Sequence, residues 1–89
     1  MGITLKIEET EFSIGDKVII KGTAVSAASQ LEVKIKDQSG QVVISLGTPI
    51  TSDDTFFLPW TVPNGFDTGT YTIIVFDNVN TDSFEIFVQ

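Results

Sequence analysis

Residues 31–36 read LEVKIK, an alternation of apolar and charged side chains that decides the fold class. In an extended chain Leu31, Val33 and Ile35 point to one side, and the residues between them point to the other. A helix would instead repeat its apolar residues at intervals of three and four positions. This stretch therefore predicts a β-strand with one face in a core and one face in water.

The same alternation continues outward from this strand in both directions. It covers residues 3–7, 12–14 and 18–20 on one side, and 42–46, 56–62, 71–75 and 84–88 on the other. Turn residues separate these runs every eight to twelve positions, and no segment shows a helical period. Gly47 and Pro49 weaken the run over 42–46, so we expect it at a sheet edge. The pattern predicts an all-β, Ig-like antiparallel sandwich of seven to eight strands with Greek-key connections, and a small barrel is the alternative.

Composition excludes several classes of function. The 89 residues suit one domain, spanning 1–89. They contain no Cys and no His, which excludes disulfides, thiolate nucleophiles, Cys/His zinc sites and Ser-His-Asp chemistry. The net charge of −7 argues against a nucleic-acid partner, and no apolar run approaches the ~18 residues of a membrane span. The acidic excess lies entirely in residues 37–89, where solubility is its simplest role. We expect no enzyme and no required cofactor.

Four segments resemble a known family. Residues 12–22 read FSIGDKVIIKG, 36–43 read KDQSGQVV, 54–60 read DTFFLPW and 69–73 read GTYTI. In this order they resemble the Ig-like β-sandwich repeats of prokaryotic cell-surface proteins, most of all those of archaeal S-layer proteins. Bacterial adhesin repeats and macroglobulin-type sandwich domains look similar too. Thr55 departs from the family, which usually has Gly there, and we expect a less tight turn as a result.

The resemblance implies a place and a role. It implies a structural module of an extracellular or cell-surface protein, one unit of a tandem array whose partners are neighbouring domains of the same parent. The alternative is a binding module for carbohydrate or a protein partner. The N-terminus lacks a signal-peptide pattern, so for an exported protein we expect the chain to be a piece of a longer one.

Two aromatic residues are expected to have structural roles. Tyr71 lies near the start of the penultimate strand, where the tyrosine of a sandwich commonly hydrogen-bonds the preceding corner, here residues 65–69. Trp60 alternates in phase with Phe56 and Leu58, which favours the core over an exposed sugar-stacking role. Ile74, Phe76 and Phe87 lie out of phase with the core, on strands expected to form a hairpin. They predict either a contact patch or a surface that another segment covers.

A divalent cation is the one cofactor for which the sequence offers candidate ligands. Hairpins that alternate between the two ends of a sandwich would bring the loops 26–30, 51–54 and 77–82 to one end. That end would hold Asp53, Asp54, Asp77 and Asp82 without a lysine. Oxygen ligands of this kind suit Ca²⁺, and a solvated acidic rim is the alternative.

Overall fold

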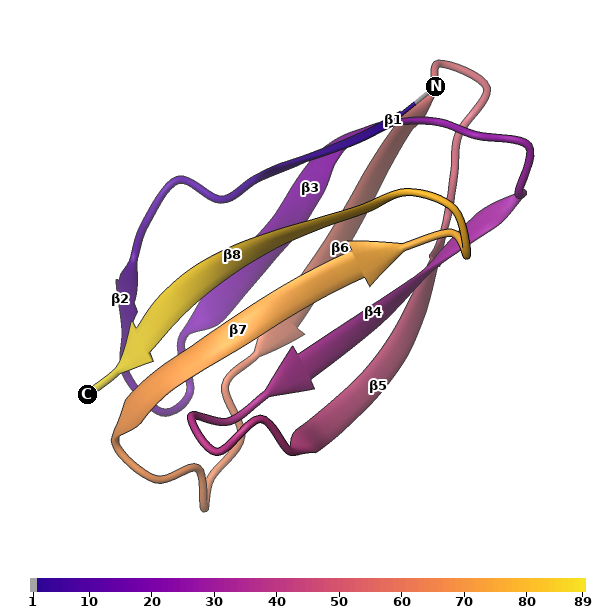
Figure 1. Cartoon of the computed structure of the whole chain (residues 1–89). Coiled ribbons are helices and arrows are strands. Elements are labelled where there is room, and N and C mark those ends of the chain that lie inside the picture. Colours follow the sequence, from indigo (N-terminus) through magenta and orange to yellow (C-terminus); the bar gives the residue numbers. More distant parts are fainter. Residues whose placement is uncertain (1) are drawn as a thin grey trace.

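The chain folds into eight β-strands. The computed structural model describes residues 2–89 (Figure 1). The strands are β1 (Gly2–Lys6), β2 (Glu11–Phe12), β3 (Lys17–Val25), β4 (Gln30–Lys36), β5 (Val42–Pro49), β6 (Thr55–Thr61), β7 (Gly69–Phe76) and β8 (Thr81–Val88). None of the described residues forms a helix that could cross a membrane.

The strands form two layers. One sheet has three strands in the order β1-β3-β6, and the other has five in the order β2-β8-β7-β4-β5. The chain crosses between the sheets after β1, β2, β3, β5 and β6, while the pairs β4–β5 and β7–β8 are hairpins within the five-stranded sheet (Figure 1). The predicted two-sheet sandwich is confirmed, and β5 is an edge strand as Gly47 and Pro49 indicated.

The core lies between the layers and follows the alternation of the sequence. On β4 the buried residues are Leu31, Val33 and Ile35, and on β7 they are Tyr71, Ile73 and Val75. Their antiparallel register places Val33 opposite Val75 and Ile35 opposite Ile73. Trp60 is only 8% exposed, so it is a core residue. Burying the apolar side chains of these neighbouring strands between the two sheets supplies the main free energy of folding.

Three local predictions need correction. β5 runs beyond residue 46 to Pro49, which is tolerated because a proline at the end of an edge strand leaves no ladder bond unmade. The run over residues 12–14 contributes only Phe12 to a strand, and β2 pairs with β8 in parallel. Thr55 does not loosen its turn, because the residue with positive φ is Asp54, at 60°.

The two ends of the chain leave the sandwich at opposite ends of its long axis, which measures 36 Å (Figure 1). We call the end with the N-terminus the N-terminal pole. It carries the loops 26–29, 50–54 and 77–80. The other end, the C-terminal pole, carries the turn 37–41 and the loop 62–68.

Candidate functional site

The three loops of the N-terminal pole meet as the sequence predicted. Ser26 donates its hydroxyl proton to the Asp77 carboxylate, which joins the first loop to the third. The backbone amide of Ile50 donates to the Ser29 carbonyl at 3.0 Å, which joins the first to the second. The acids on these loops therefore share one end of the molecule.

Asp77 serves the turn that follows it. One of its carboxylate oxygens accepts the backbone amides of Asn80 at 2.6 Å and Val79 at 2.9 Å, and the other accepts from Ser26. The bond from the Asn80 amide, then those from Ser26 and Val79, hold the pKa of Asp77 far below its ordinary value. Donors that favour the charged form explain this shift. Asp77 is an internal acceptor for its own turn.

Asp82 joins the two sheets. Its carboxylate accepts the Leu5 amide at 2.8 Å and the Ser83 amide at 3.0 Å. Leu5 lies on β1, an edge strand of the other sheet, so its amide has no strand to pair with on that side. Asp82 supplies the acceptor that a further strand would have supplied.

The structure does not gather the four acids into a cation site. Asp53 and Asp54 are exposed on the loop 50–54, while Asp77 and Asp82 are engaged as described. Among residues 2–89 no three acidic side chains lie close enough together to hold a metal ion. The sequence placed the loops together but could not show where each carboxylate points, so a cation at this pole stays a prediction.

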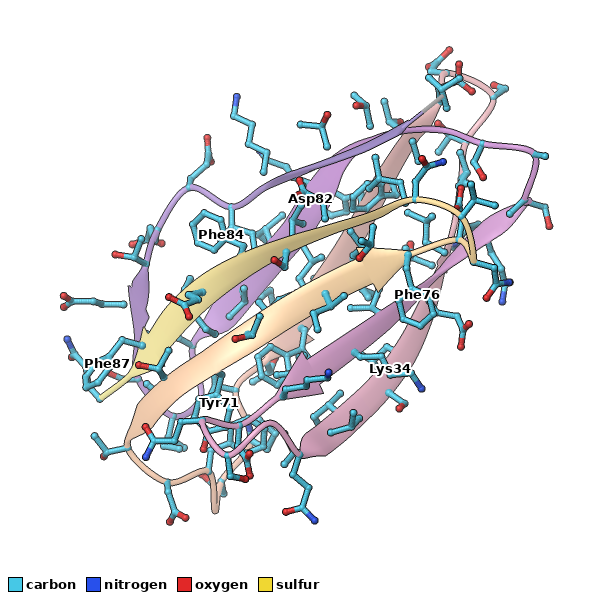
Figure 2. The ribbon with its side chains drawn as sticks, in the orientation of Figure 1. Lys34, Tyr71, Phe76, Asp82, Phe84 and Phe87 are labelled. Carbon is cyan, nitrogen blue, oxygen red and sulfur yellow. The ribbon has the colours of Figure 1, made fainter. Side chains whose placement is uncertain are left out.

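The predicted patch of Ile74, Phe76 and Phe87 is not one surface. Antiparallel pairing sets Phe76 opposite Thr81 and Phe87 opposite Thr70, at the two ends of the β7–β8 pair. Figure 2 shows Phe76 and Phe87 far apart along the sheet. Ile74 and Phe76 are half-buried, and Phe87 is 40% exposed. All three side chains lie on the outer face of the sheet, as the sequence predicted, but the register of β7 and β8 puts Phe87 far from Phe76.

Tyr71 forms the expected corner. Its hydroxyl donates to the Asp67 carbonyl at 2.9 Å across the end of the loop 62–68. Phe66 stacks on the Tyr71 ring with centroids 4.7 Å apart, and its centroid lies 5.7 Å from that of Trp60. Burial raises the pKa of the Tyr71 hydroxyl, and the nearby carboxylates of Asp67 and Asp37 add to this.

A cavity of about 460 Å³ opens beside this corner, at the C-terminal pole. The turn 37–39 forms one wall, and the loop from Gly65 into the start of β7 forms the other. The aromatic part of the lining comes from Phe66 and Tyr71, and most of the remaining lining residues are polar. The volume falls within the usual range of small-ligand pockets, about 300 to 1,000 Å³.

Sequence reasoning missed this cavity. The two turns that form it were recognisable as turns, Asp37-Gln38-Ser39-Gly40 and Pro63-Asn64-Gly65. The alternation of hairpin ends that grouped the acidic loops also places these two turns together at the other end. That topology was the signal that could have found the cavity.

Comparison with solved structures places the sandwich among known domains. A Salmonella alpha-2-macroglobulin reacted with methylamine contains a similar domain, with a TM-score of 0.79 and 14% identity over 99% of this chain and 6% of that one. A thermostable endoglucanase (D468A mutant) from Alicyclobacillus acidocaldarius has a TM-score of 0.67 and 16% identity, over 99% of this chain and 15% of that one. The IG1+IG2 structure of DIP-gamma has a TM-score of 0.51 and 11% identity, over 100% of this chain and 48% of that one. No protein-family model matches the chain, and no curated protein sequence matches it.

These likenesses define the class of fold. The chain is an all-β, Ig-like sandwich, and it spans only a small part of the macroglobulin and endoglucanase chains that it resembles. At 11 to 16% identity the similarity concerns the fold alone.

Proposed function

We propose that this chain is a structural module of a larger cell-surface protein, one Ig-like unit of a tandem array, with no catalytic role of its own. The observation that carries the proposal is the exit of β1 and β8 at opposite ends of the 36 Å axis (Figure 1). Modules joined through such ends extend a chain instead of folding back on it. The likeness of the sequence motifs to archaeal S-layer repeats supports the surface location.

The chemistry of the acidic residues supports a structural role. Asp77 holds a turn and Asp82 joins the sheets, so two of the four candidate ligands already accept hydrogen bonds inside the module. The junction cation suggested by the sequence is therefore not part of this proposal. Neighbouring modules are the expected partners.

Two measurements test the proposal. Small-angle X-ray scattering on two copies fused end to end should give a maximum dimension about twice the 36 Å of one module. A compact, folded-back pair would contradict an extending array. In the parent protein, similar units should flank this one, and protease added to intact cells should cleave them. A parent that is protected inside the cell would contradict the surface location.

A further inference from the structure

The cavity at the C-terminal pole has the chemistry of a ligand site. Phe66 supplies an apolar wall, and the polar groups come from both sides, among them Gln38 from the turn and Asp67 and Thr68 from the loop. A few polar groups converging on an aromatic surface are typical of small-molecule sites. Neither the strand pairing nor the corner bond of Tyr71 accounts for these groups.

The position of Gln38 depends on a glycine. A Cβ atom at Gly69 would lie 2.9 Å from the Gln38 side-chain oxygen, so the amide of Gln38 occupies the space that a side chain would fill. This brings the turn 37–41 over the start of β7. The amide group carries two N–H donors and one acceptor. No hydrogen bond inside the described part of the chain uses them.

The charges at the cavity exclude an anion. Asp37 and Asp67 line it, and none of the lining residues is a lysine. One oxygen of Asp37 already accepts hydrogen bonds from the Ser39 amide, the Ser39 hydroxyl and the Gln41 amide. These bonds, chiefly the one from the Ser39 hydroxyl, lower the pKa of Asp37. The carboxylates are therefore acceptors for hydroxyl groups, and they would repel an acidic ligand.

We propose that this cavity binds a neutral saccharide, with ring C–H groups against Phe66 and hydroxyls bonded to Gln38 and Asp67. A sugar hydroxyl both donates and accepts, so it matches the mixture of carboxylate, amide and hydroxyl groups in the lining. An organic cation without oxygen, such as tetramethylammonium, would match the carboxylates and aromatic rings, but it has no acceptor for the amide of Gln38 or the hydroxyl of Thr68. The site goes beyond the structural role, since a surface module with it could also hold a glycan.

The test is an NMR titration of backbone amides with cellobiose, mannobiose and N,N′-diacetylchitobiose. At least one of these disaccharides should give saturable shifts confined to residues 37–41 and 65–71. Gln38→Ala and Asp67→Asn should each weaken that binding about tenfold, the effect of losing one good hydrogen bond. The Tyr71 corner survives the second change because it uses the backbone carbonyl of Asp67.

Gln30→Ala is the matched control. Gln30 is an exposed glutamine at the start of β4, near the opposite pole, so its removal should leave the dissociation constant unchanged. Three results would overturn the proposal. They are no saturable shift with any of the three sugars, shifts centred elsewhere on the molecule, or shifts produced by tetramethylammonium but not by the sugars. None of these results bears on the extended array, which scattering tests separately.

Discussion

Asp82 shows how much a single carboxylate can contribute to a sandwich. Figure 2 places it on β8 where that strand passes β1, and its oxygen accepts the Leu5 amide at 2.8 Å. Asp82→Ala would leave this amide without a partner beside a side chain that is only 8% exposed. We expect a loss of about 1 to 3 kcal/mol in the free energy of unfolding.

Denaturant melts of Asp82→Ala and Asp53→Ala measure this difference. Asp53 is exposed, so its removal should change stability by no more than about 0.5 kcal/mol. Equal losses in the two variants would show that the Asp82 bond contributes nothing.

Asp77 predicts a dependence of stability on pH. Its pKa is lowered from the ordinary value of 3.8, chiefly by the Asn80 amide and then by Ser26 and Val79. The ionised form is favoured in the folded state, so its stabilisation is fully present above pH 3.8 and is lost as the pH falls toward the lower, folded-state pKa. Asp77→Asn should therefore lower the melting temperature at neutral pH.

The pH series supplies its own control. The gap in melting temperature between wild type and Asp77→Asn should stay constant from pH 7 down to about pH 5 and narrow below the ordinary carboxyl pKa. A gap that widens as acid is added would reverse the assigned sign.

At the scale of the elements, Gly22 permits the pairing of β1 with β3. It lies opposite Leu5, and a Cβ atom there would sit 1.8 Å from the Thr4 carbonyl oxygen and 3.0 Å from the Phe56 ring. The first neighbour is backbone and cannot rotate away. Gly22→Ala should destabilise the fold by about 1 to 3 kcal/mol or more, because β1 must shift away from β3.

Gly47→Ala is the comparison for this change. Gly47 is also inside a strand, but the nearest atoms to its added Cβ lie at 3.5 and 3.6 Å, which is ordinary contact. Its replacement should leave stability unchanged or raise it by up to about 1 kcal/mol. Thermal melts that show equal effects at the two glycines would remove the steric explanation.

The sequence predicted the elements better than the site, for a physical reason. The side-chain period of a strand is local, so residues 31–36 define both the strand and its buried face. The contacts of a carboxylate are not local. Asp82 finds its partner 77 positions away in the sequence, and the cavity exists only where two turns meet. The same limit explains the patch of Phe76 and Phe87, whose separation depends on register.

At the scale of the whole molecule, tension between the ends acts along the strands. Pulling draws β1 and β2 toward the N-terminal pole and β8 toward the C-terminal pole (Figure 1). β2 lies parallel to β8, and the amides of Phe87 and Gln89 donate to Thr10 and Phe12 at 2.7 and 2.8 Å. These bonds lie across the pulling direction, so they must break together. Such geometry suits a module of an extended array.

Force applied at the chain ends can be compared with force applied across the β4–β5 pair. The chain has no cysteine, so attachment points can be introduced one pair at a time. Gln30→Cys with Pro49→Cys marks two exposed residues that face each other at the open end of the β4–β5 pair. Pulling there peels the edge strand β5 from β4 one bond at a time. Single-molecule stretching should require a clearly higher peak force from the chain ends than from this pair, and an equal or lower force from the ends would argue against a load-bearing module.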